Sequence, residues 1–455
     1  MKKVMYVASA LVLVGVAFGT ASAHSIRPQA AHTAKCTATG DISYMFWGDK
    51  GEDGEQMQAI SAAEKACPGL HVKAIWDQGN YDGDLTTELG SGNAPDVFQL
   101  DAGKRVPEFV TQGAVVNMAP YIKAHHINVY KTYSPVCARQ AYYKGKGPYG
   151  LIRDCGNNSM LVYNKSLFEA RHVALPTNNW TLNDLKKAAI KLSGTYSYNG
   201  VSELRFGIGL QTDEYRINGY MFPFGGNWLT ANDKCGLTSA GSRAGLQWWN
   251  DLAYKYHGAP TSSQQGVVGD PNGSFVTQRY AMELAGPWVP DYQLKPSAYT
   301  GNKPVSFKWG VVLPPERGNV KAPKGAPKAN VHIGGVVDPA LESVYSHSKH
   351  IKAAEAFVYY LTTSKPASLE GQYGIGLPGD IAVAHQANVK AEYAPYYKTW
   401  IAGDVDGQAL RSVPKHTQYT NATVNGGALV PFWQGTQSVD QATTAACKAV
   451  QPDLP

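Results

Sequence analysis

Charged residues are scarce in this sequence, and no long run of one charge sign occurs. Of its 455 residues only 17% are charged, and 41 basic against 35 acidic residues leave a net charge of +6. So slight a basic excess, without a run of Lys or Arg to follow phosphates, disfavours a nucleic-acid binder. A hydrophobic content of 44% with a small net charge excludes intrinsic disorder for most of the chain. The length predicts two or three domains.

Several motifs of catalysis and cofactor binding are also missing. The chain has no C-x-x-C pair, which disfavours a zinc site or a redox motif, and no G-x-S-x-G nucleophile elbow. The run 374–379 matches G-x-G-x-x-G formally, but it contains a proline and no helix pattern follows it. The pair His125-His126 lacks a matched set of carboxylates. We therefore expect no metal, no cofactor and no catalytic residue.

A long apolar run occurs only near the N-terminus. Lys2 and Lys3 precede the uncharged apolar stretch 4–18, and Ala21-Ser22-Ala23 has the pattern of a cleavage site. This arrangement predicts a signal peptide at 1–23, cleaved after Ala23, and a flexible leader at 24–35. The run is shorter than the ~20 residues that span a bilayer. We expect an exported protein with a mature net charge of +4, in the periplasm or outside the cell.

Six cysteines remain after the predicted signal peptide. An even number in an exported chain predicts disulfides, and six cysteines allow about 15 full pairings, among which sequence cannot choose. One pair has a geometric argument. Cys36 precedes the first predicted strand and Cys67 ends the helix that follows it. Because the helix of a strand–helix unit returns to the starting end of the strand, we predict a Cys36–Cys67 disulfide.

Predicted strands and helices alternate along the chain, which is typical of α/β sheets. The first part has strands at 42–47, 72–76 and 96–100 and helices at 55–66 and 82–89. A hairpin is predicted around 142–152. The later part has strands at 159–163, 206–210, 309–313 and 331–337, and helices at 182–192, 242–256, 351–361 and 437–450.

Several short segments along 41–450 occur in a distinctive order. They are Trp47-Gly48-Asp49-Lys50-Gly51, Gly90-Ser91-Gly92-Asn93-Ala94-Pro95-Asp96-Val97, Gly150-Leu151-Ile152-Arg153-Asp154, Leu161-Val162-Tyr163-Asn164-Lys165, Phe224-Gly225-Gly226-Asn227-Trp228, Gly286-Pro287-Trp288 and Gly334-Gly335. In this order they resemble the sugar-binding class of bacterial extracellular solute-binding proteins. These proteins are the binding components of ABC importers, and maltose-binding protein is their best-known member. The chain departs from the family pattern at Ile152, where a proline is usual, and at Gln278-Arg279, where Gly-Lys is usual.

The resemblance implies an α/β chain with the two-lobed periplasmic-binding-protein fold of type II. The ligand cleft is expected between two lobes that are joined by a hinge which the chain crosses several times. We place lobe I at 36–155 and 314–365, and lobe II at 156–313 and 366–455. The implied function is capture of a sugar or oligosaccharide by lobe closure and delivery to ABC transporter permease subunits in the membrane. We expect a monomer that is not an enzyme.

Sugars present hydroxyl rims and apolar C–H faces, which carboxylates, amides and aromatic rings complement. The loops that resemble the family's cleft loops carry this mixture, and several follow predicted strands, where open α/β sheets bind ligands. Trp288 is the strongest single candidate. For Asp101 a helix-capping role competes with ligand binding, and for Asp154 a hinge role does. The expected ligand-binding residues are Trp47, Asp49, Lys50, Asp101, Asp154, Asn157, Asp213, Tyr215, Asn227, Trp228, Trp288, Gly334 and Gly335.

Two alternatives stay open. A secreted glycoside hydrolase would need two carboxylates roughly 5–10 Å apart, and Asp49, Asp154 and Asp213 are available for the pair. A binder of the same fold would instead take an anionic solute, iron or a polyamine. Paired tyrosines are available for iron, whereas the positive charge of the mature chain disfavours a polyamine.

Overall fold

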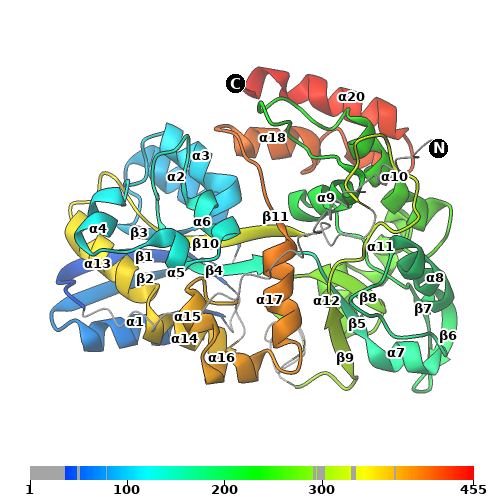
Figure 1. Cartoon of the computed structure of the whole chain (residues 1–455), viewed down its shortest axis with the longest axis horizontal. Coiled ribbons are helices and arrows are strands. Elements are labelled where there is room, and N and C mark those ends of the chain that lie inside the picture. The colour runs from blue at the N-terminus through cyan, green and yellow to red at the C-terminus, as the bar shows by residue number, and fades with distance from the viewer. Residues whose placement is uncertain are drawn as a thin grey trace, which may run out of the picture.

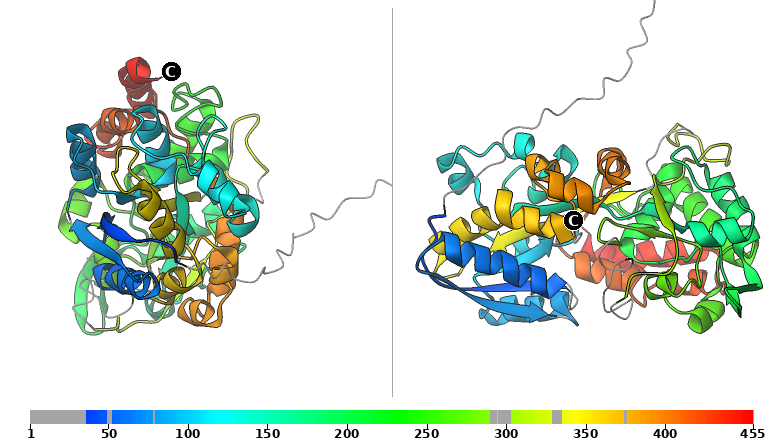
Figure 2. Two further views of the ribbon diagram at one scale, coloured as in Figure 1. Left: turned by 90° about the vertical axis from the view of Figure 1, so that its left-hand side faces the viewer. Right: turned by 90° about the horizontal axis from the view of Figure 1, so that it is seen from below.

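The computed structural model describes residues 36–48, 52–77, 79–289, 294, 303–328, 335–373 and 376–454. Figure 1 shows two bodies side by side, and the right-hand view of Figure 2 shows the same two bodies from below. We call the body around the larger sheet the first lobe and the body around the smaller sheet the second lobe. Among the described residues, no helix combines the length and the apolar character needed to cross a bilayer.

The first lobe is built on a six-stranded sheet. Strand β1 (Gly40–Trp47) lies between β2 (Leu70–Asp77) and β3 (Val97–Asp101) and runs parallel to both. Next to β3 lies β10 (Val336–Val344), which is antiparallel to it. Two further strands also pair with β10: β4 (Leu151–Asn157) and β11 (Gln408–Ala409). Since β1, β2 and β3 are parallel, their carboxyl ends share one edge of the sheet.

Helices cover both faces of this sheet. In Figure 1, α3 lies above the sheet and α1 below it, where α1 also contacts α13 and α14. The helices of this part are α1 (Glu52–Ala66), α2 (Tyr81–Ser91), α3 (Ala102–Thr111), α4 (Ala119–Ala124), α5 (Val129–Thr132), α6 (Pro135–Ala138), α13 (Ile351–Leu361), α14 (Ser364–Tyr373), α15 (Ile381–Ala384) and α16 (Ala387–Glu392).

The second lobe has a three-stranded antiparallel sheet with β5 (Met160–Asn164) between β8 (Met282–Ala285) and β9 (Trp309–Val312). A separate hairpin joins β6 (Gly194–Tyr198) to β7 (Val201–Arg205). The helices around them are α7 (Lys165–Ala170), α8 (Leu182–Leu192), α9 (Glu214–Met221), α10 (Ala240–Tyr254), α11 (Ser262–Val268), α12 (Pro271–Val276), α18 (His416–Thr423), α19 (Val430–Trp433) and α20 (Val439–Val450).

The chain passes between the two sheets three times. Asn158 and Ser159 connect β4 of the first sheet directly to β5 of the second. The chain returns before β10, and it leaves the first sheet again after β11. Helix α17 (Tyr397–Asp406) lies between the two bodies in Figure 1 and contacts β4. The hinge between the lobes is therefore made of several separate segments of the chain.

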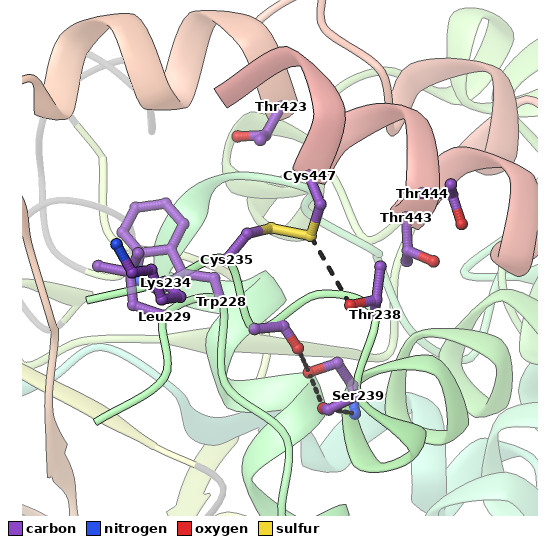
Figure 3. Close-up of a disulfide and its surroundings, with 12 residues drawn as sticks. Trp228, Leu229, Lys234, Cys235, Thr238, Ser239, Thr423, Thr443, Thr444 and Cys447 are labelled. Atoms are coloured by element: carbon purple, nitrogen blue, oxygen red, sulfur yellow. Dashed lines mark hydrogen bonds between the residues drawn. A yellow bond between two sulfur atoms is a disulfide. The ribbon is translucent and has the colours of Figure 1, made fainter. Parts of the chain in front are cut away.

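Three disulfides join all six cysteines. Cys36–Cys67 lies in the first lobe and is the pair expected from the strand–helix geometry. Cys137–Cys155 joins α6 to β4. The third bond, between Cys235 and Cys447, is shown in Figure 3, where Cys447 on α20 reaches the loop that precedes α10.

Some predicted elements differ from the structure. The predicted strand at 206–210 is wrong, because only Phe206 pairs there, in an isolated bridge to Tyr280. The predicted hairpin at 142–152 reduces to a bridge between Tyr143 and Lys146 before β4 begins. Most of the predicted strand at 331–337 lies outside the described residues. The lobe boundaries stay a prediction, and the contacts of α14 with α1 favour moving the second boundary beyond 365.

Candidate functional site

A pocket of about 390 Å³ lies at the shared carboxyl edge of the first sheet. It collects residues that follow three parallel strands: Trp47 ends β1, Asp101 ends β3, and the turn after β2 contributes the remainder. The lining residues are Trp47, Gly79, Asn80, Tyr81, Asp82 and Asp101. We call this the carboxyl-edge pocket. Two of its predicted residues, Trp47 and Asp101, are thus brought together as the strand-end rule requires.

The turn after β2 is held by a local hydrogen-bond pattern. The side chain of Asp77 accepts hydrogen bonds from the backbone N–H groups of Gly79 and Asn80, at 2.8 and 3.1 Å. This Asx-type turn reverses the chain so that α2 begins at the pocket. The Tyr81 hydroxyl then donates to the Gln99 carbonyl at 2.9 Å. Burial raises the pKa of Tyr81 well above its usual value, so the phenol keeps its proton.

Two aromatic rings line the pocket, and a guanidinium lies beside one of them. The rings of Trp47 and Tyr81 pack edge to face with centroids 5.1 Å apart. The Arg153 guanidinium lies 5.2 Å from the centroid of the Trp47 ring. Arg153 also forms an ion pair with Asp154 at 2.7 Å. Asp154 accepts a hydrogen bond from the backbone of Ala340 at 3.3 Å, so its oxygens are already engaged at the strand junction.

The second lobe presents the first turn of α9 to this region. Asp213 caps that helix by accepting hydrogen bonds from the N–H groups of Tyr215 and Arg216. An aspartate at this position satisfies backbone donors that the helix leaves free. The cap directs Glu214 toward Lys104 of the first lobe, with which it forms an ion pair at 3.0 Å. Asp213 itself forms an ion pair with Arg216 at 3.4 Å.

Buried charges at this junction compensate one another. Burial is the largest single influence on the pKa of the Glu214 carboxyl and raises it, but the Lys104 ammonium, its hydrogen bond and smaller contributions together hold that pKa at about 2. The Lys104 pKa is depressed by burial and raised further by Asp101 and Glu214, so it lies well above its usual value. Burial and then the Asp101 charge raise the pKa of Asp338 to about 8. Lys104 is therefore charged at neutral pH between two carboxylates.

Trp288 follows a tight Gly-Pro turn beside β4. A Cβ on Gly156 would lie 2.5 Å from the Pro287 ring, and one on Gly286 would lie 1.9 Å from the Trp288 ring. Both positions therefore require glycine for packing. The Trp288 ring is half-buried, and the Arg216 guanidinium lies 6.0 Å from its centroid. Arg216, in the first turn of α9, thus connects Trp288 to the helix start that Asp213 caps.

Four further predicted residues make contacts within the protein. Asn157 is buried, and its amide donates to the Gly403 carbonyl at 2.9 Å. A Cβ on Gly335 would lie 2.1 Å from that same amide. Trp228 is 1% exposed, and its indole N–H donates to the Arg411 carbonyl. Asn227 accepts from the Leu229 N–H at 3.3 Å and lines a separate pocket. None of the four lines the carboxyl-edge pocket, and their roles in ligand binding stay predictions.

Three predicted residues, Asp49, Lys50 and Gly334, lie outside the described part of the chain. Sequence reasoning missed Tyr81 and Asp82, although the strand-end rule applied to β2 would have found both. It also missed Lys104, whose signal is its position one helical turn after Asp101. Asp338 and Glu214 carry no local signal. Asp338 reaches Gly103-Lys104 through the pairing of β10 with β3, which lies far away in the sequence, and Glu214 becomes a neighbour of Lys104 only where the lobes meet.

The described residues contain no group of three His, Cys, Asp or Glu side chains with the geometry to hold a metal ion. The carboxylates of the site are engaged by cations instead. Asp82 pairs with Arg105 at 2.6 Å, and Asp101 pairs with Lys104 at 3.0 Å. The chemistry of the site is thus that of hydrogen-bond acceptors of fixed orientation beside aromatic rings.

Comparison with known proteins places this geometry in context. The profile of the family described as "Bacterial extracellular solute-binding protein" matches residues 47–367. No curated protein matches the sequence. Many solved structures share the fold.

A substrate-binding protein of an ABC transporter from Listeria monocytogenes, solved with cycloalternan, is 18% identical with a TM-score of 0.75. A solute-binding protein from Thermotoga lettingae, bound to alpha-D-tagatose, is 20% identical with a TM-score of 0.71. The maltose/maltodextrin-binding domain from Bdellovibrio bacteriovorus, bound to maltotriose, is 18% identical with a TM-score of 0.70. Each match covers 91% of this chain and 99% of the other. At these identities the likeness establishes the two-lobed fold.

Proposed function

Because the chain belongs to the bacterial extracellular solute-binding proteins, we propose that it captures a sugar or oligosaccharide between its lobes and delivers it to the membrane permease of an ABC importer. The solved proteins of the same fold hold cycloalternan, tagatose and maltotriose, which supports a carbohydrate as the ligand class. The protein is proposed to be exported, with the segment 1–23 as its signal peptide, and to act as a monomer without catalysis.

The carboxyl-edge pocket is the observation that carries this proposal. It sets the rings of Trp47 and Tyr81 beside the carboxylates of Asp82 and Asp101. Aromatic rings cover the C–H faces of a sugar, and carboxylates accept from its hydroxyl groups. On the second lobe, Trp288 is proposed to close over the bound sugar. Asp49 and Lys50 stay predicted ligand contacts.

The ion pairs of the site favour a neutral ligand. Asp82, Asp101, Asp154 and Asp213 each face a cation of the protein within 3.4 Å. A carboxylate that is held by Arg or Lys still has lone pairs for hydroxyl donors, but it attracts a ligand cation less. Neutral sugars therefore suit these acids better than polyamines do.

Capture is proposed to work by lobe closure. A ligand that contacts both lobes stabilises the closed state over the open one, in proportion to its difference in affinity for the two. The closed form is then the one that the permease recognises. A wrong sugar leaves buried polar groups of the site without partners, which supplies specificity.

The first test is a thermal-shift screen of the mature protein against a library of sugars, with chromatography of every hit. A ligand that binds only the folded state raises the melting temperature by mass action. Recovery of an unchanged sugar supports the proposal. A cleaved sugar would favour a glycoside hydrolase. Stabilisation only by iron, polyamines or anions would show that the ligand is one of these and not a sugar.

The second test removes one ring from the site. We expect Trp288→Ala to weaken binding of the sugar hit at least about 100-fold in calorimetry, because a stacked ring supplies several kcal/mol in a desolvated site. The matched control is Trp248→Ala, which removes a half-buried ring on α10 of the same lobe. If Trp288→Ala keeps the wild-type affinity and the wild-type circular dichroism, Trp288 does not contact the sugar.

A further inference from the structure

One lysine connects the two lobes through charge. Lys104 lies on α3 of the first lobe, and its Nζ is 3.0 Å from Asp101 in the same lobe and 3.0 Å from Glu214 in the second lobe. The Nζ also lies 4.3 Å from the centroid of the Tyr215 ring. The side chains of Lys104 and Glu214 are only 15% and 11% exposed. The contact is therefore shielded from solvent and from salt.

A second polar connection runs beside the first. The Tyr215 hydroxyl donates to Asp338 Oδ2 at 2.9 Å, and the other oxygen of Asp338 accepts from the Gly103 N–H at 2.6 Å. A Cβ on Gly103 would lie 2.8 Å from this carboxylate, so the close approach requires glycine. The two lobes are thus connected at two points. Lys104 pairs directly with Glu214, and Asp338 bridges Gly103 and Tyr215. We call Gly103, Lys104, Glu214, Tyr215 and Asp338 the lobe clasp.

Both sides of the lobe clasp are rigidly mounted. On the first lobe, Arg105 pairs with Asp82 and with Glu108, which fixes α3. The backbone carbonyl of Lys104 accepts from the Ser412 hydroxyl at 2.8 Å. On the second lobe, the Asp213 cap fixes the first turn of α9. Lys104 can therefore pair with Glu214 only when the lobes are in this relative position. The ion pair forms in that position and stabilises it.

We propose that Lys104 is a positioning residue that couples the sugar site to lobe closure. Through Asp101 it orients an acceptor of the carboxyl-edge pocket, and through Glu214 it holds the second lobe against the first. The coupling to ligand rests on the proposed function, whereas the effect on closure does not. Breaking a buried pair by removing one partner leaves an unpaired charge and costs more than removing both.

The test is a double-mutant cycle on ligand-free protein, with Lys104→Met, Glu214→Gln and the combination. Because all six native cysteines form disulfides, Met57→Cys on α1 and Val267→Cys on α11 supply one exposed dye site on each lobe. Single-molecule energy transfer between the dyes gives the closed fraction. We expect each single variant to lower the ratio of closed to open molecules at least about fivefold, and the double variant to fall no further.

Two controls separate positioning from structure. Lys104→Arg keeps the charge and is expected to restore closure, whereas Lys123→Met, an exposed lysine of α4, is expected to change nothing. Urea unfolding of each variant separates a change in closure from a change in lobe stability. Unchanged closed fractions, additive single effects or no rescue by arginine would overturn the proposal.

The coupling to ligand is measured with maltotriose and tagatose as probes. We expect Lys104→Met to weaken the affinity of whichever probe binds, and to weaken it more than Glu214→Gln does, because Lys104 also orients Asp101. An equal or smaller loss would overturn the coupling. If neither probe binds the wild type, these two sugars are excluded as ligands, while the ligand-free measurement still decides the lobe clasp.

Discussion

The two lobes bury their apolar side chains in different ways. The described core of the first lobe forms one continuous cluster around a six-stranded sheet. The described core outside that cluster, mostly in the second lobe, divides into three clusters, of which one includes Val389 of α16 and another Val336 of β10. One of these contains side chains from as far apart as Ile217 and Val450. The first lobe is thus a single layered body, whereas the second depends on its C-terminal helices to complete its core.

The disulfides follow the same division. Those anchored in the first lobe, Cys36–Cys67 and Cys137–Cys155, span 31 and 18 residues. The one in the second lobe, Cys235–Cys447, spans 212 residues. It ties α20 to the loop before α10, beside Trp228 and Leu229 of the divided core. Covalent reinforcement over a long loop therefore occurs where the apolar core is least continuous.

The largest expected effect comes from removing that bond. Chain-entropy arguments assign about 5 kcal/mol to a 212-residue loop and about 4 kcal/mol to a 31-residue loop. We expect Cys235→Ala/Cys447→Ala to destabilise the protein more than Cys36→Ala/Cys67→Ala does. Urea unfolding with hydrogen exchange, which reports each lobe separately, measures the difference. A greater loss of unfolding free energy in the Cys36→Ala/Cys67→Ala variant would contradict the conclusion that the second lobe depends more on its disulfide.

An intermediate effect distinguishes a buried acid inside the first lobe from one between the lobes. Burial raises the pKa of Glu342 to about 7, whereas at Glu214 the Lys104 charge and hydrogen bonds together offset burial and hold that pKa at about 2. Folding stability from Glu342 is present below its unfolded pKa of about 4.5 and is lost as the pH rises through 7. Stability from Glu214 is present above about 4.5 and is lost as the pH falls toward 2. Each change amounts to about 3 kcal/mol.

Urea unfolding at pH 3, 5 and 8 tests these opposite slopes. We expect Glu342→Gln to be more stable than wild type at pH 8 and similar at pH 5. Glu214→Gln is expected to be less stable at pH 8, with the gap narrowing at pH 3. Glu88→Gln, on the exposed face of α2, is the control. If the stabilities of the Glu342→Gln and Glu214→Gln variants, relative to wild type, depend on pH in the same way, the opposite pKa shifts of Glu342 and Glu214 are contradicted.

The smallest expected effect concerns helix starts. In the second lobe, Thr181 and Asp184 form a capping box at α8. In the first lobe, Asn80 precedes α2 without a capping hydrogen bond from its side chain. We expect Thr181→Ala to cost about 1 kcal/mol and Asn80→Ala clearly less, measured by urea unfolding. Equal losses would mean that the cap does not distinguish the two helices.

The fold was largely predictable where local pattern decides. Helices α8 and α13 have the predicted limits, since a capping box and apolar periodicity coincide at α8 and apolar periodicity alone marks α13. The strand β10 was not predictable over its full length, because Asp338 and Pro339 interrupt the apolar pattern that identifies a buried strand. Phe206 and its neighbours have strand composition, yet their pairing is decided by distant segments, so composition misled there.

The site divides in the same way. Trp47 and Asp101 were predictable, because the ends of parallel strands share an edge whatever the rest of the chain does. The packing of Trp228 against Tyr419 and His416 was not predictable, because a tryptophan after a Gly-Gly turn suits burial as well as binding; its assignment as a ligand contact stays a prediction. The partner of Lys104 on the second lobe depends on lobe geometry, which no local pattern carries.

The Cys235–Cys447 bond has a topological consequence. The chain between these cysteines contains β8 and β9 of the second sheet and also β10 and β11 of the first, so the closed covalent ring passes through both lobes. A single protease cut anywhere from 236 to 446 would therefore open the ring without releasing a fragment. On a gel the nicked protein would keep its full mass without reductant and would separate into two pieces with it.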